Sequence, residues 1–271
     1  YAGSAELAAQ LLEEGQNSPA DVFFAQDAGA LGAVAKAGLL TKLPDDILGL
    51  VSAQYSAADG SWVGVSGRVR VFVYNPDTVV NVPSSVFDLA EPEWQGRIAI
   101  APTNASFQAF VTAMRVIHGE DKTLEWLQAM KTNAVIYEKN SAILEAVESK
   151  IVDAGLINHY YWFAMGREIG FDNLTSRLGQ FEARDVGNLI NAAGVGIVSD
   201  SNAARSFVEY LLSKTGQQYF VDQTSEYPLI SGIEAGVDLT PLSQIPAPDI
   251  DLSDLDSLEE TLNLIREAGL I

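Results

Sequence analysis

Two tyrosines stand side by side in the segment NHYYWF, residues 158–163, directly after the apolar run GLI. Successive side chains of a β-strand leave on opposite faces, so Tyr160 and Tyr161 can reach one target only if a strand ends just before them. A hard trivalent cation such as Fe³⁺ lowers the pKa of a phenol strongly and binds the resulting anionic oxygen. The same residues also fit an aromatic cluster that packs an interface or stacks on an organic ligand, and taken alone they favour that cluster.

Polar residues follow three predicted strands at the point where a helix begins. Asn104 and Ser106 stand at the first of these helix starts, Asn140 or Ser141 is the predicted N-cap of the second, and Asn158 opens the third. In open α/β sheets the carboxyl ends of the strands form the binding crevice, and free N–H groups of the following helices favour an anion. A single Asn or Ser there is more often a cap than a ligand contact. We expect a site if all three strands share one sheet.

The rest of the chain alternates short β-rich runs with amphipathic stretches, which is an α/β pattern. Ser4 is the predicted cap of the first helix, which Gly15 ends. Three prolines between 241 and 248 predict an extended surface strap, and a helix is expected from about Ser257 to Ala268. The predicted strands include 21–25, 68–75, 97–101 and 153–157, and the predicted amphipathic stretches include 4–15 and 203–223.

The composition narrows the classes of function. The 271 residues, 48% of them hydrophobic, are enough for one large or two medium domains. The net charge of −20 repels phosphate backbones, so no nucleic-acid partner is expected. The absence of cysteine excludes disulfides, zinc–thiolate sites and thiol catalysis. The common nucleotide-binding, hydrolase and zinc-protease signatures are missing and there are only two histidines, so we expect a binding protein that is not an enzyme.

Taken together, these segments resemble the ferric-ion-binding proteins of bacterial ABC-type iron uptake, within the two-lobed substrate-binding proteins. The resemblance covers essentially the whole chain, and its most specific parts are ADVFF and NxYY. The similar segments, in order, are NSPADVFFAQDAGAL (17–31), GVSGRVRVFVYN (64–75), WQGRIAIAPTNASFQAF (94–110), YEKNSAILEAV (137–147), GLINHYYWF (155–163) and SEYPL (225–229).

The resemblance implies a site, position by position. Tyr160 and Tyr161 match the paired tyrosines that bind ferric iron in the family. The positions that match those holding a synergistic anion, phosphate or carbonate, are Asn104, Ala105, Asn140 and Asn158, with Arg68 as a match for an arginine that assists carbonate. Gln26 stands where many members have a glutamate ligand, and Ser106 where some have a third tyrosine, so both are possible cleft contacts. The family begins with a strand and helix that would precede Tyr1. We therefore expect iron binding to depend strongly on the anion.

The implied fold is a two-lobed periplasmic-binding-protein-like α/β fold whose N-terminal strand and helix are missing. The first lobe is expected to span 1–67 and 188–240, and the second 68–187 and 241–271, with strands at 68–75 and 188–198 crossing between them and ligand held between the lobes.

The implied function is extracytoplasmic capture of ferric iron with its anion for an inner-membrane ABC permease. The protein is expected to be a monomer, either periplasmic or lipid-anchored. The alternative binding protein carries a small organic or phosphonate anion, with the tyrosine cluster as a stacking platform. An enzyme is the remaining alternative, and turnover of a substrate would be the observation that supports it.

Overall fold

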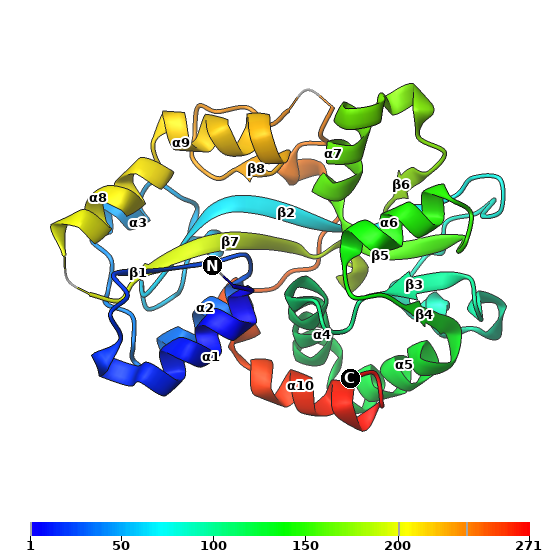
Figure 1. The fold of residues 1–271 in the computed structure, drawn as a ribbon, viewed down its shortest axis with the longest axis horizontal. Helices are drawn as coiled ribbons and strands as arrows, with labels where there is room; N and C mark the ends of the chain where they lie inside the picture. Colours follow the sequence, from blue (N-terminus) through cyan, green and yellow to red (C-terminus); the bar gives the residue numbers. More distant parts are fainter. Residues whose placement is uncertain (1, 200, 237) are drawn as a thin grey trace. The chain divides into compact units, whose positions relative to one another are not determined.

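The computed structural model describes residues 2–199, 201–236 and 238–271, which form two compact α/β units (Figure 1). Unit 1 comprises Tyr1–Arg68, Asn191–Leu242 and Ile250–Leu258; unit 2 comprises Val69–Ile190, Ser243–Asp249 and Glu259–Ile271. The predicted lobes placed everything after residue 240 in the second lobe. Segment Ile250–Leu258 instead lies in unit 1, because Leu252 and Leu255 are buried and their short helix packs on the second helix of that unit.

Unit 1 has a sheet in which β1 pairs antiparallel with β7, and β8 pairs antiparallel with the first half of β2. Its elements are α1 (Ser4–Glu14), β1 (Val22–Ala25), α2 (Ala28–Lys36), α3 (Asp45–Leu48), the first half of β2 (Val63–Tyr74), β7 (Ile190–Ile197), α8 (Asn202–Leu211), α9 (Lys214–Tyr219) and β8 (Tyr227–Pro228). The predicted amphipathic stretch 203–223 is divided, because Ser213 caps a new helix by accepting a hydrogen bond from the Gly216 N–H.

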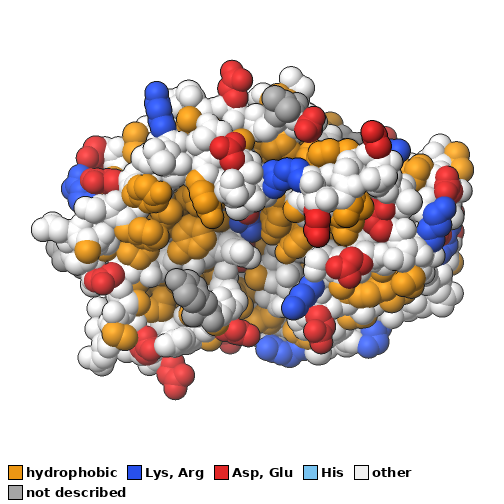
Figure 2. Space-filling model, turned by 45° about the horizontal axis from the view of Figure 1, so that its top comes forward, with side chains coloured by type: hydrophobic (Ala, Val, Ile, Leu, Met, Phe, Trp, Pro, Cys, Tyr) orange, Lys and Arg blue, Asp and Glu red, His pale blue; other side chains and the backbone are white. Residues whose placement is uncertain are grey.

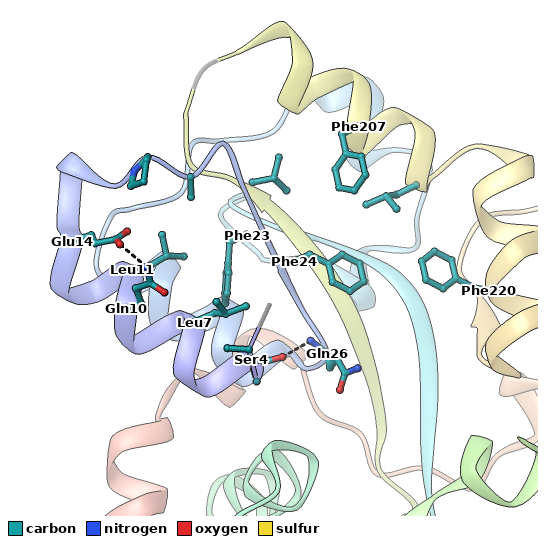
Figure 3. Close-up of a pocket in the computed structure, with 16 residues that line it drawn as sticks. Ser4, Leu7, Gln10, Leu11, Glu14, Phe23, Phe24, Gln26, Phe207 and Phe220 are labelled. Carbon is teal, nitrogen blue, oxygen red and sulfur yellow. Dashed lines mark hydrogen bonds between the residues drawn. The ribbon is translucent and has the colours of Figure 1, made fainter. Parts of the chain in front are cut away.

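The first helix ends as predicted but begins differently. Gly15 follows α1 with a positive φ of 57°, a conformation that glycine adopts without strain. The predicted cap at Ser4 is wrong, because Gly3 is the N-cap and Ser4 is already helical. The Ser4 hydroxyl instead accepts a hydrogen bond of 2.9 Å from the backbone N–H of Gln26, and so ties α1 to the end of β1 (Figure 3).

An apolar pocket of about 770 Å³ lies within unit 1 beside that contact. Figure 3 shows Leu7 and Leu11 of α1 on one side, Phe24 of β1 in the middle, and Phe207 and Phe220 on the other. Among the described residues its lining includes one carboxylate, that of Glu14, which accepts hydrogen bonds from Gln10 and Ser18. A hard trivalent cation needs several anionic oxygens, so this pocket does not have the lining of an iron site.

Unit 2 supplies the edge at which the predicted helix starts meet. β3 is parallel to both β4 and β5, and β5 is antiparallel to the second half of β2. The carboxyl ends of β3, β4 and β5 therefore lie at one edge, as the sequence predicts. The elements are β3 (Ile98–Ile100), α4 (Ala105–His118), α5 (Glu120–Asn133), β4 (Ala134–Ile136), α6 (Asn140–Glu148), β5 (Ala154–Asn158), α7 (His159–Ile169), β6 (Arg177–Gly179) and α10 (Leu258–Glu267).

Two strands carry the chain between the units, as predicted. β2 passes from unit 1 to unit 2 between Arg68 and Val69, and β7 returns near Ile190. Within the described residues, no helix is long and apolar enough to cross a membrane. Acidic side chains are spread over the face shown in Figure 2, with lysines and arginines scattered among them.

Candidate functional site

The three predicted helix starts are present in unit 2, but they are not all capped as expected. Asn104 is the N-cap of α4, and its side-chain oxygen accepts from the Ser106 N–H at 3.0 Å. Asn158 is the N-cap of α7. The predicted cap at Asn140 or Ser141 is wrong, because α6 begins at Asn140 and Lys139 is its N-cap. The Asn140 side chain is thereby left to interact beyond its own helix.

Asn140 joins the starts of α4 and α6 into one polar cluster, formed by Asn104, Ser106 and Asn140. The Asn140 Nδ2 donates to Asn104 Oδ1 at 3.3 Å and to Ser106 Oγ at 3.2 Å. Ser106 Oγ also donates to Asn104 Oδ1 at 2.6 Å. Ala105, the first residue of α4, lies between two of these side chains in the sequence. The expectation that these residues converge at the sheet edge is met for this cluster, and helix N-termini here provide a setting for an anion.

Arg70 is the charged member of this site, and it is not among the residues predicted from the sequence. Its side chain is 2% exposed, donates from Nη1 to Ser106 Oγ at 3.4 Å, and lies over the rings of Phe107 and Phe110. In the part of the chain that the structure describes, no acidic side chain pairs with Arg70, and its Nε and Nη2 have no hydrogen-bond partner.

The charge of Arg70 interacts with the two tyrosines, Tyr160 and Tyr161. Burial lowers the pKa of the Arg70 guanidinium to about 9, and electrostatic interaction with Tyr160 and Tyr161 opposes that shift. A buried cation without a counter-charge is unfavourable, and an anion at the polar cluster would supply the missing charge and acceptors.

Arg68, the arginine selected by resemblance, has a different setting in unit 1. Its Nη2 donates to Glu226 Oε1 at 3.1 Å, and Glu226 also accepts from the Ser66 hydroxyl. Arg68 and Arg70 are two residues apart on one strand and so share a face, which is why the sequence pattern does not separate them. The signal that was available is the arginine itself within an apolar strand, because a buried charge requires a partner.

Tyr160 and Tyr161 lie in the first turn of α7, as predicted. Their ring centroids are 4.5 Å apart with an interplanar angle of 33°, and the Asn158 Nδ2 donates to the Tyr160 hydroxyl at 3.4 Å. Both side chains are partly exposed. Adjacent phenols stand together here because the strand ends at Asn158 and the chain begins to coil at the next residue.

The aromatic residues that follow the tyrosines, Trp162 and Phe163, pack against neighbouring segments. The aromatic-cluster hypothesis assigned this packing role to all four residues from Tyr160 to Phe163. The Trp162 Nε1 donates to the buried Ser176 Oγ at 3.0 Å, and the hydroxyl of Ser176 is bonded in turn to Glu148. The rings of Trp162 and Phe163 also contact Phe171. Packing of α7 therefore rests on these residues, while the phenols gather at the start of the helix.

Gln26 lies at the end of β1 in unit 1 with an exposed side chain. Its neighbour Asp27, which no motif in the sequence marks, is 4% exposed and caps α2 by accepting from the Ala30 N–H at 3.0 Å. Burial raises the pKa of Asp27, against the opposing effects of that hydrogen bond and of the Arg68 charge. Asp27 therefore takes up its charge less readily in the folded protein than in the unfolded chain.

We expect Asp27→Asn to stabilise the protein at neutral pH. A carboxyl whose pKa is raised on folding imposes no cost below its unfolded pKa of about 4, and a growing cost as pH rises towards its folded pKa. Asparagine keeps the oxygen that caps α2 and removes the charge. Urea unfolding from pH 4 to pH 8 should show the gain appearing as pH rises.

The matched control is Asp77→Asn, because a hydrogen bond from Lys150 lowers the pKa of Asp77 and the sign reverses. The assignment fails if the stability difference between Asp27→Asn and the parent is independent of pH.

Residues 17–257 match the family model for bacterial extracellular solute-binding proteins. The Fe(3+)-binding periplasmic protein of Serratia marcescens is 38% identical over 99% of this chain and 81% of its own length. The major ferric iron-binding protein of Neisseria meningitidis serogroup A is 36% identical over 98% of this chain and 82% of its own length.

Solved structures give the same picture of the fold. Iron-bound HitA from Pseudomonas aeruginosa superposes with a TM-score of 0.94 at 36% identity, covering 99% of this chain and 89% of that one. A Trichodesmium protein in complex with iron and citrate superposes with a TM-score of 0.85 at 27% identity, with the same coverage of both chains. The two-lobed α/β fold class predicted from the sequence is confirmed.

Proposed function

The chain belongs to the bacterial extracellular solute-binding protein family, and we propose that it captures ferric iron with a synergistic anion outside the cytoplasm and delivers it to an ABC importer. The names of its relatives in Serratia and Neisseria, and the iron-bound HitA structure, support iron as the ligand. The observation that carries the proposal is the placement, at one edge of unit 2, of two adjacent phenols and a buried Arg70 that has no acidic partner among the described residues.

Tyr160 and Tyr161 are the proposed metal ligands. Phenolate oxygens are anionic and hard, which is the donor type that Fe³⁺ prefers. The cationic Arg70 interacts electrostatically with both side chains. Two phenolates leave most of an octahedral site unfilled, so further oxygen donors have to come from elsewhere.

An oxyanion held by the polar cluster is the proposed source of those donors. Asn104, Ser106 and Asn140 present amide and hydroxyl groups at two helix starts. The Nε and Nη2 of Arg70, which no described residue accepts from, add donors and charge. Asn158 contributes through the start of α7 and its contact with Tyr160. Phosphate and carbonate both match this donor-rich setting. The citrate in the Trichodesmium structure shows that a relative binds iron together with an organic anion.

The direct test is a titration of the iron-free protein with a soluble ferric complex in the presence of phosphate, carbonate or citrate, followed by visible absorption. Phenolate coordination should produce a charge-transfer band that saturates at one iron per chain. A protein that stays colourless with every anion would overturn the iron assignment. Binding of a phosphonate by calorimetry without metal, and without colour, would instead support the organic-anion function, with the tilted tyrosine pair as the stacking platform.

The double substitution of Asn140 and Asn158 by leucine should weaken iron binding roughly 10-fold or more in phosphate buffer without unfolding the protein. Each substitution removes an amide from the cluster or its neighbour, and a lost hydrogen bond to a charged group is worth about 1.5–3 kcal/mol. Iron affinity should be measured by competition with a chelator, and folding by thermal denaturation.

The control is Asn133→Leu, which removes a buried asparagine that donates to the carbonyls of Leu89 and Glu91. Asn133 precedes β4 and so lies at the opposite end of the strands from the site. Equal iron affinity in the double variant and the parent would show that the asparagines only stabilise their helices.

A further inference from the structure

His159 is a buried histidine between the two proposed ligand tyrosines and the strand that carries Arg70. It directly follows the last residue of β5 and is the first residue of α7. Its side chain is 2% exposed, and its Nδ1 accepts a hydrogen bond of 3.1 Å from the backbone N–H of Val69. Val69 is itself buried and immediately precedes Arg70 on β2.

This hydrogen bond continues a strand ladder after one of its strands has ended. Arg70 is paired with Asn158 in the β2–β5 register, so the next position along the ladder joins Val69 to His159. The backbone of His159 has already turned into α7 and no longer lies alongside β2. The imidazole nitrogen takes the place of the missing carbonyl, and the buried N–H of Val69 obtains an acceptor that it would otherwise lose at a cost.

The same ring also contacts the phenol that begins the metal site. The imidazole lies edge-on to the Tyr160 ring with centroids 5.7 Å apart, and edge-on to Phe163 at 6.1 Å. The His159 side chain is therefore hydrogen-bonded to the backbone of Val69 and packed against the ring of Tyr160.

We propose that His159 is a positioning residue that holds the Tyr160–Tyr161 pair in place relative to Arg70. This role rests on the proposed function of the site. Supporting groups that orient metal ligands commonly change metal affinity by about 10- to 100-fold when they are removed. His159 acts through Tyr160 and the backbone of Val69, without itself supplying a ligand.

Two substitutions separate the acceptor from the ring. His159→Phe keeps a ring against Tyr160 and removes the acceptor, so iron affinity should fall about 10- to 100-fold and the charge-transfer band should shift and weaken. His159→Asn places an amide oxygen close to the position of Nδ1, and should recover most of the affinity and the band. The matched control is the other histidine, in His118→Phe. His118 ends α4, about 20 Å along the helix from Asn104.

Hydrogen exchange at the Val69 amide gives a reading that does not require iron. In the iron-free protein, exchange should be faster in His159→Phe than in the parent and slow again in His159→Asn. If the parent protein stays colourless when iron is added, the proposed function fails. Hydrogen exchange at the Val69 amide would still test the hydrogen bond between Val69 and His159. The inference is overturned if His159→Phe exchanges and binds iron like the parent. It is also overturned if both variants lose stability and affinity equally, because packing of the ring would then explain the whole effect.

Discussion

Tyr161→Phe should remove most of the visible colour of the iron-loaded protein and weaken iron binding by more than about 100-fold. The substitution leaves the ring beside Tyr160 and removes only the oxygen that can bind Fe³⁺ as phenolate. An effect of this size exceeds the roughly 10- to 100-fold loss typical of removing a group that merely supports a ligand. Visible absorption and chelator competition in the same phosphate buffer should show the two losses together.

The control for this experiment is Tyr74→Phe. Tyr74 ends β2 opposite Ala154, which is the amino end of β5 and therefore the end remote from the site. Its ring stacks on Phe72, so the substitution tests the loss of a tyrosine hydroxyl elsewhere in unit 2. Retention of the parent's band and affinity in Tyr161→Phe would exclude this residue as a ligand.

Arg70→Met should weaken iron binding about 10- to 100-fold in anion-containing buffer while leaving thermal stability unchanged or raised. Methionine fills a similar volume against Phe107 and Phe110 but lacks the charge and the donors. Replacing a buried charge by a well-packed apolar side chain is often neutral or stabilising, whereas a charge-assisted hydrogen bond to a bound anion is worth about 1.5–3 kcal/mol. The opposite directions of the two effects distinguish a functional arginine from a structural one.

The test should also measure phosphate binding to the iron-free protein by calorimetry, because the anion is the group that Arg70 is proposed to hold. The control is Arg97→Met, which removes an arginine that precedes β3 and pairs with Asp153 before β5, at the amino ends of these strands. Unaltered phosphate and iron affinity in Arg70→Met, with the control behaving likewise, would show that the buried charge is not part of an anion site.

Several features of this protein can be predicted from the local sequence, because the start and end of a helix or strand depend on residues close by in the chain. The strand that ends at Asn158, the helix that begins immediately afterwards and the shared first turn of the two tyrosines all follow from the sequence around 153–168. Asn104 caps its helix and Gly15 ends another, since both depend on backbone conformation within a few residues. The alternation of strands and helices predicted the α/β fold, and resemblance supplied its two-lobed form.

The contacts between elements were decided by the tertiary structure. The prediction that Asn140 or Ser141 caps α6 was wrong, because Lys139 is the N-cap. The side-chain amide of Asn140 instead donates hydrogen bonds to Asn104 and Ser106 at the sheet edge. Segment Ile250–Leu258 belongs to unit 1, because Leu252 and Leu255 of its short helix are buried there, although the residues on either side of the segment belong to unit 2.

The choice between the two arginines of β2 shows the physical reason most clearly. Arg68 and Arg70 lie on the same face of one strand, because side chains two residues apart in a strand point to the same side. The alternation of polar and apolar residues therefore does not distinguish the two arginines. Glu226, distant in sequence, neutralises Arg68, while the helix starts beside Arg70 supply Ser106 and no carboxylate within the described residues. The role of His159 likewise depends on where β5 stops beside β2. Burial and partners that come from remote segments determine what a charged or polar side chain does, and they are fixed only when those segments pack together.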